Sequence, residues 1–234
     1  MLNVYCIPGL GINEEIFRNL ELENCTVRYI KWISPLKNER LPEYASRLAE
    51  QIDSSHPFAL IGMSFGGMCA VEIAKRLNPI KTILVSSNKT CAETPMNMRM
   101  WAQFPFYKNF NDSFYKGAAM SIKSLFGVKS KEHSERFERM LNSAPENYFA
   151  GAIHCLLTWD NREVPQNLVH IHGTADLVLP YQKVSNCDYT IKDGTHFMIV
   201  NKSEEINAII NEELRASIGS IVKPAYQVNR TAAN

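Results

Sequence analysis

The sequence has 234 residues, of which 25 are lysine or arginine and 24 are aspartate or glutamate. This near balance predicts no strongly basic face and argues against a nucleic-acid partner. No apolar run approaches the length that spans a membrane. Residues 1–7 lack the basic start and cleavage site of a secretion signal, so we interpret them as the first core strand of a cytoplasmic protein. The six cysteines and six histidines show neither paired nor metal-ligand spacing, so we expect no disulfide, metal or cofactor.

Short apolar or β-branched runs alternate with segments of helical period along most of the chain. The expected strands cover residues 2–7, 25–31, 58–61, 80–86, 167–172 and 187–191. Helices are expected from the Asn13 cap to about Leu20, from Pro42 to about Ser54, directly after residue 64, and from about Glu204 to Ile218. The alternation predicts an α/β fold with a doubly wound, mostly parallel sheet.

Residues 89–164 interrupt this alternation. They carry methionine and aromatic residues at helical spacings and little β-branched sequence, and prolines and Gly127 divide them. We interpret this segment as three or four helices inserted between two core strands, which would form a cap. The core then comprises residues 1–88 and 165–218, and residues 219–234 are expected to form a poorly ordered C-terminal tail.

The segment Gly62-Met63-Ser64-Phe65-Gly66 joins a short apolar run to a run of helical period. It has the G-x-S-x-G pattern, in which a serine stands on a strained strand-to-helix turn. The tight corner leaves no room for side chains two residues to either side of the serine, which explains the two glycines. The free N–H groups at the start of the following helix would face a developing oxyanion.

A serine nucleophile needs a base, and the base needs an acid that orients it. Asp176 follows one predicted strand and His196 follows the next, in the chain order serine, acid, histidine. The carboxyl ends of parallel strands meet at one edge of the sheet, so we expect these side chains to converge with Ser64. Asp160 and Glu163 are rival acids at the boundary of the cap, and His172, within a strand end, is assigned a structural role.

Three motifs together resemble the α/β-hydrolase family: Gly62-Met63-Ser64-Phe65-Gly66-Gly67, His172-Gly173-Thr174-Ala175-Asp176 and Gly194-Thr195-His196. The segment Pro8-Gly9-Leu10-Gly11 is similar to the family's His-Gly-x-Gly loop, with proline in place of histidine. The resemblance implies Ser64 as nucleophile, His196 as general base and then acid, and Asp176 as the orienting acid. It also implies an oxyanion hole made by the backbone N–H groups of Phe65 and Leu10, and a fold that lacks the family's first hairpin.

The apolar side chains of the cap favour an uncharged, partly apolar acyl substrate of small to medium size. We expect Met63, Trp101, Phe104 and Phe197 to line its pocket. The leading hypothesis is a serine hydrolase, specifically a carboxylesterase that forms an acyl-enzyme. A second hypothesis is a thioesterase, or an esterase for acyl groups on a carrier protein, which a basic or apolar docking face on the cap would favour. A lyase or C–C hydrolase and a non-hydrolytic small-molecule receptor remain further alternatives.

Overall fold

Six parallel strands form one sheet in the order β2-β1-β3-β4-β5-β6, which confirms the predicted α/β architecture. The computed structural model describes residues 1–101 and 103–222, without the side chains of residues 97, 99, 101 and 220–222. The strands are β1 (Leu2–Ile7), β2 (Cys25–Tyr29), β3 (Phe58–Met63), β4 (Lys81–Val85), β5 (Leu168–Gly173) and β6 (Tyr189–Ile191). Because all strands run the same way, their carboxyl ends share one edge, and the loops that follow them meet there.

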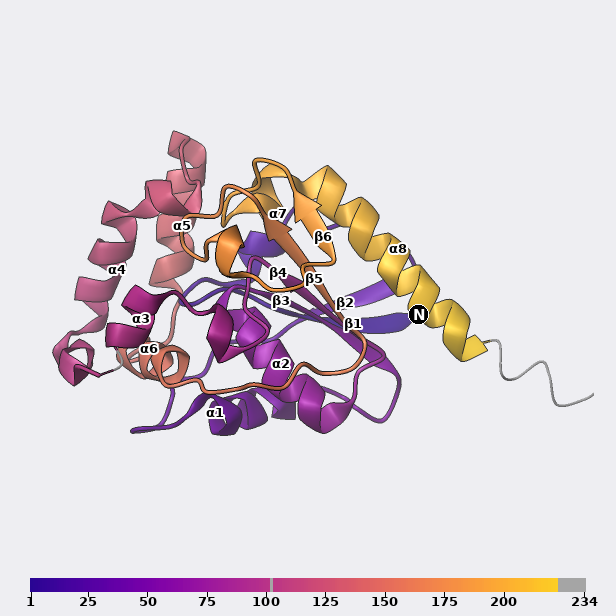
Figure 1. Ribbon diagram of the computed structural model, residues 1–234, viewed down its shortest axis with the longest axis horizontal. Coiled ribbons are helices and arrows are strands. Elements are labelled where there is room, and N and C mark those ends of the chain that lie inside the picture. Colours follow the sequence, from indigo (N-terminus) through magenta and orange to yellow (C-terminus); the bar gives the residue numbers. More distant parts are fainter. Residues whose placement is uncertain (102, 223–234) are drawn as a thin grey trace, which may run out of the picture.

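Helices cover both faces of the sheet (Figure 1). On one side lie α1 (Leu41–Leu48) and α2 (Phe65–Leu77), and on the other lies α8 (Ser203–Val222), preceded by α7 (Met198–Asn201). The final helix is longer than predicted, because residues 219–222 continue it instead of beginning a tail. The rest of the expected tail, residues 223–234, lies outside the described residues.

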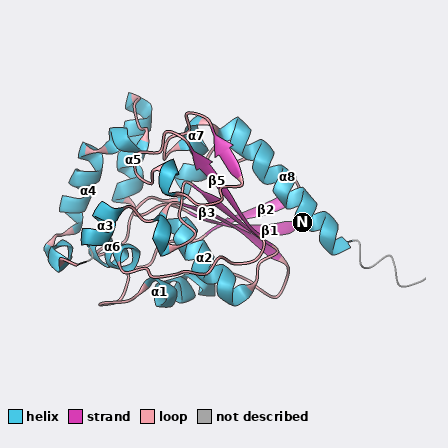
Figure 2. Cartoon of the chain, in the orientation of Figure 1, coloured by secondary structure: helices cyan, strands magenta, loops and turns pink. Residues whose placement is uncertain are grey.

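The chain between β4 and β5 forms a group of helices at one end of the molecule (Figure 2). The α-helices are α3 (Met96–Trp101), α4 (Asp112–Ser121), α5 (Lys131–Asn142) and α6 (Phe149–Leu157), and the 3-10 turns are η3 (Cys91–Glu93), η4 (Pro105–Asn109) and η5 (Lys123–Phe126). Side chains of Asn111 and Ser130 cap α4 and α5, since each accepts a hydrogen bond from a backbone N–H of the first turn.

Two predicted helices near the N-terminus are shorter than expected. Asn13 caps the first as predicted, but only the 3-10 turn η1 (Glu14–Phe17) forms. This turn buries the consecutive pair Ile16 and Phe17, where an amphipathic helix would bury residues three or four apart. The second expected helix is α1 followed by the 3-10 turn η2 (Ala49–Gln51), and another such turn, η6 (Tyr181–Lys183), precedes β6.

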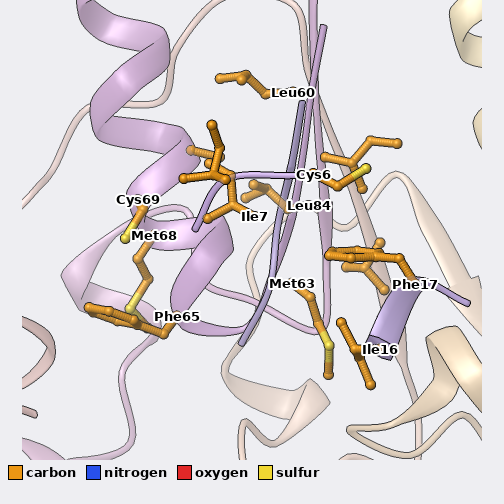
Figure 3. Packing of buried hydrophobic residues seen from close by; sticks show 14 of the residues in the cluster. Cys6, Ile7, Ile16, Phe17, Leu60, Met63, Phe65, Met68, Cys69 and Leu84 are labelled. Carbon is orange, nitrogen blue, oxygen red and sulfur yellow. The ribbon is translucent and has the colours of Figure 1, made fainter. Parts of the chain in front are cut away.

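The core lies where β3 meets its neighbours. All six residues of β3 are buried, because the strand has partners on both edges and helices on both faces. Figure 3 shows Met63 directed toward Ile16 on one side of the strand end, while Phe65 lies beside Met68 on the other. The chain before and after Ser64 is thereby held from two directions.

No helix in the described ranges has both the length and the apolar character needed to cross a membrane.

Candidate active site

Ser64 stands on a strained turn between β3 and α2. Its φ of 53° and ψ of −124° lie in a region that residues with a side chain rarely adopt. A Cβ atom on Gly66 would lie 2.2 Å from the carbonyl oxygens of both Ile7 and Pro8. A Cβ atom on Gly62 would lie 2.5 Å from the Cα atom of Gly67, at the start of α2. The two glycines therefore permit the close approach of backbone segments that projects the Ser64 hydroxyl from the sheet edge.

The structure brings the three predicted side chains of this site together. The Nε2 atom of His196 lies 2.9 Å from the Ser64 hydroxyl oxygen, and its Nδ1 atom lies 2.8 Å from Oδ2 of Asp176. The histidine and the aspartate are buried, with exposed fractions of 2% and 3%. Each residue follows a different strand, so three distant segments supply one continuous line of hydrogen bonds.

Asp176 is held in its ionised form by its surroundings. Burial alone would raise the pKa of its carboxyl, but the electrostatic interaction and the hydrogen bond with the His196 imidazole oppose the effect of burial, as does the N–H of Leu179. The net result is a pKa below the ordinary value. The N–H groups of Val178 and Leu179 both donate to Oδ1, at 2.9 Å, which leaves Oδ2 directed at the imidazole.

An apolar cavity of about 320 Å³ opens beside Ser64 and His196. Its walls come from the core and from the cap, and among the residues with described side chains no lysine, arginine, aspartate or glutamate lines it. Met63 and Phe197 line this cavity as predicted. The prediction for Phe104 is wrong, because its side chain is 56% exposed at the outer side of the cap, just before the Pro105 turn. The side chain of Trp101 lies outside the described residues.

One aromatic contact of His196 was not predicted from the sequence. Phe126, from the cap, lies edge-on to the His196 ring with 5.6 Å between ring centroids, and it also lines the cavity. Its carbonyl oxygen accepts a hydrogen bond from the N–H of Phe197 at 2.9 Å. The cap therefore touches the loop that carries the imidazole, which no periodicity in the sequence could indicate.

No protein-family model matches the sequence, and no curated protein does. Solved structures share the fold. An esterase from Thermogutta terrifontis is 18% identical with a TM-score of 0.68, over 93% of this chain and 90% of the esterase. MenH from S. aureus is 16% identical with a TM-score of 0.68, over 92% and 94% of the two chains. The chain has the α/β-hydrolase fold. ClbQ from the colibactin NRPS/PKS pathway shares it too, at 14% identity and a TM-score of 0.61, over 92% of this chain and 98% of ClbQ.

In this α/β-hydrolase fold, the side chain of Trp32 supports the loop that begins at Pro8. The indole N–H of Trp32 donates to the carbonyl oxygens of Gly9, at 3.2 Å, and Ile12, at 2.8 Å. These two carbonyls bracket Leu10, whose N–H is an expected oxyanion donor. The Trp32 ring is buried and lies against Phe65, with 5.6 Å between ring centroids. One side chain therefore contacts both segments from which the expected oxyanion donors come.

The sequence contains one signal for the role of Trp32. A buried indole almost always finds an acceptor for its N–H, and this tryptophan follows the second strand directly. Ser87 lies just after β4. Its hydroxyl donates to the carbonyl oxygen of Ser64 at 2.6 Å, so it fixes the turn from the β4 side.

His172 has the structural role that the sequence predicted. Its Nε2 atom donates to the carbonyl oxygen of Leu179 at 2.8 Å, and its Nδ1 lies 3.2 Å from Nε2 of His170. Burial lowers the pKa of His172. Burial and the neighbouring His172 together lower the pKa of His170 to about 3. The pair is therefore neutral and holds the turn that presents Asp176.

In the parts of the chain with described side chains, no group of three or more histidine, cysteine, aspartate or glutamate residues converges as metal ligands would.

Proposed function

We propose that the protein is a serine hydrolase that cleaves carboxylic esters of small to medium, partly apolar acyl groups. The observation that carries the proposal is the unbroken line of hydrogen bonds from Ser64 through His196 to Asp176. This is the arrangement that a hydroxyl nucleophile needs, since the imidazole can accept its proton while the carboxylate stabilises the resulting charge. The esterases among the solved structures with this fold support such chemistry as well.

The reaction would proceed in two halves. The Ser64 oxygen attacks the carbonyl carbon while Nε2 of His196 takes the hydroxyl proton, and the N–H groups of Phe65 and Leu10 stabilise the oxyanion. The intermediate collapses when His196 passes that proton to the departing alkoxide, which leaves an acyl-enzyme. Water then gives a proton to His196 and attacks the acyl carbon, and the acid departs as the serine is reprotonated. Loss of one oxyanion donor in such a reaction typically raises the barrier by about 3 kcal/mol.

The cavity supports the substrate class. An apolar cavity of about 150 Å³ is known to accept benzene, so the 320 Å³ available here suits an acyl group of about ten to twelve carbons at most. None of the described side chains that line the cavity is a lysine or arginine that would neutralise a second carboxylate or a phosphate. The acyl chain would extend among Leu141, Phe149 and Ile153, away from the nucleophile.

The proposal is tested by labelling and by a chain-length series. Wild type, Ser64→Ala and the matched exposed-serine control Ser113→Ala would be treated with a fluorophosphonate probe and assayed on p-nitrophenyl esters of two to sixteen carbons. We expect labelling and turnover in wild type and Ser113→Ala alone, with turnover declining beyond about twelve carbons. Equal turnover by Ser64→Ala, or no labelling and no turnover in wild type, would refute the hydrolase. Such an outcome would favour the receptor or lyase alternatives.

A second candidate, hydrolysis of an acyl group held on a carrier protein, has one observation in its favour. The outer side of the cap is both apolar and basic, with exposed phenylalanines and lysines in the same segment. Comparing an oxygen ester with a thioester of the same acyl group, with Ser64→Ala as the blank, would separate esterase from thioesterase activity.

A further inference from the structure

Charge is distributed unevenly along a chain whose total is almost neutral. Residues 94–131 contain six basic residues and a single acidic one, Asp112, so the remainder of the chain carries more acidic than basic residues. Both carboxylate oxygens of Asp112 accept hydrogen bonds, from the N–H groups of Tyr148 and Phe149. The one negative charge in the segment is therefore directed inward, to the start of α6. A protein with such an uneven charge distribution is steered so that its positive region faces a negatively charged partner.

The same segment exposes large apolar side chains, which we call the outer cap surface. Its members, with exposed fractions of 40–65%, are Met96, Met100, Phe104, Phe106, Phe110, Phe114, Ile122 and Leu125. They come from α3, η4, α4 and η5 and their junctions, and α3 and α4 form the end of the molecule farthest from α8 (Figure 1). Phe110 and Phe114 stack on one another with 4.1 Å between ring centroids. Exposed apolar side chains concentrated in one segment of the chain are typical of an interaction surface.

The outer cap surface continues into the cavity beside Ser64. Ile122 is 47% exposed and also lines the cavity, and Ala118, one turn earlier on α4, is exposed and lines it as well. Met98 of α3 lines the cavity too. An acyl group can therefore pass from this surface to the nucleophile along apolar side chains, so a partner bound here would be placed to deliver it.

Two kinds of negatively charged partner would fit the charge, an acidic protein and an anionic lipid bilayer. The cavity decides between them, because an acyl chain of about ten to twelve carbons fills it. The chains of membrane lipids are longer than that, whereas an acyl group attached to a carrier protein need not be. Two lysines of the segment come from the same elements as exposed phenylalanines: Lys108, which is exposed, is in η4 between Phe106 and Phe110 in the sequence, and Lys116, which is half-buried, is in α4 with Phe114.

We propose that the outer cap surface docks a small acidic protein that carries the acyl substrate covalently, with the acyl group entering the cavity past α3 and α4. This inference rests on the proposed hydrolase function and deepens it by naming the source of the substrate. Lys108 and Lys116 contribute to steering the partner, and the exposed phenylalanines contact it. The acyl group itself is recognised by the cavity.

The test compares one acyl group in three forms: octanoyl-pantetheine, octanoyl attached to a bacterial acyl carrier protein, and p-nitrophenyl octanoate. We expect wild type to show a kcat/KM at least tenfold higher for the carrier-bound form than for the pantetheine form. The double variant Lys108→Glu/Lys116→Glu is expected to lose at least tenfold in kcat/KM on the carrier-bound form, and less than twofold on the p-nitrophenyl ester. A matched control, Arg28→Glu/Arg76→Glu, reverses two exposed charges on the core and is expected to change neither.

The outcomes separate the two proposals. If wild type cleaves p-nitrophenyl octanoate but prefers the pantetheine form, or if the lysine and arginine variants behave alike, the docking inference is wrong and the hydrolase stands. Wild type that binds vesicles of anionic lipid, and loses this binding in the lysine variant without any preference for the carrier, would assign the surface to a bilayer instead. If none of the three forms is cleaved, the hydrolase proposal itself fails.

Discussion

Replacing Trp32 by phenylalanine would test whether its indole holds the loop around Leu10 in place for catalysis. The substitution keeps an aromatic ring among Tyr44, Phe65 and Tyr148, and removes the single N–H that reaches Gly9 and Ile12. The Gly9 carbonyl retains a second donor, the N–H of Ile12, at 3.2 Å. The variant should therefore fold.

Two magnitudes follow from these contacts. Leaving the Ile12 carbonyl without its indole partner should lower the free energy of unfolding by about 1–3 kcal/mol. A complete loss of one oxyanion donor costs about a hundredfold to a thousandfold in kcat, so a loosened Leu10 N–H should cost about ten- to a hundredfold. The side chain of Trp32 does not line the cavity, so KM should change little while kcat and kcat/KM fall together.

The chain offers a matched control in Trp159. This tryptophan is also buried and also donates its indole N–H, to Glu72 at 2.7 Å, but it lies away from the loop at Leu10. Both Trp→Phe variants would be measured by urea unfolding and by steady-state hydrolysis of a p-nitrophenyl ester. Stability should fall in both, and kcat in Trp32→Phe alone. An unchanged kcat in Trp32→Phe, or an equal fall in the control, would refute the reasoning.

Three further predictions concern the turn, the buried histidines and the cavity. Gly66→Ala places a Cβ 2.2 Å from two backbone oxygens and should prevent stable folding, whereas Gly117→Ala, with no atom within 4 Å, should be tolerated and stabilise α4 by up to about 1 kcal/mol in thermal unfolding. The pKa of His170 is lowered from an ordinary 6.5 to about 3, so the unfolded chain binds the proton more tightly and stability should fall as pH drops below about 6.5. His170→Asn should reduce the loss between pH 7 and pH 4.5 in urea titrations by about 2 kcal/mol, and an identical pH profile would contradict this. Ala119→Leu should fill part of the cavity and shift the ester series toward acyl groups shorter by about two to four carbons, and an unchanged profile would place the acyl chain elsewhere.

The central strands β1, β3, β4 and β5 could be predicted because most of their residues are buried on both faces. Such strands appear as short apolar runs, as in Phe58–Met63, and all six strands of the sheet were expected within a few residues of their observed bounds. The Ser64 turn was also predictable, since the glycines at 62 and 66 are demanded by backbone contacts that a side chain would block. In both cases a local pattern reflects a constraint that acts on the same few residues.

The missed features depend on contacts between residues far apart in the chain. Phe104 has the composition of a pocket residue, but the Pro105 turn places it outside, and only the packing of the cap determines this. The contact of Phe126 with His196 joins segments 70 residues apart. The donor role of Trp32 depends on where the loop after β1 lies relative to the end of β2. Periodicity and spacing carry no information of this kind.

The surroundings of Asp176 explain why one of two nearby histidines is suited to act as a base. Oδ2 of Asp176 lies 2.8 Å from Nδ1 of His196 and 3.5 Å from Nε2 of His172, so the carboxylate alone does not select between them. Both nitrogens of His172 are already engaged by protein groups, and its ring has no exposure. His196 has one nitrogen paired with the carboxylate and the other directed at the Ser64 hydroxyl. Of the two imidazoles, only that of His196 therefore has a second nitrogen left to pair with the Ser64 hydroxyl.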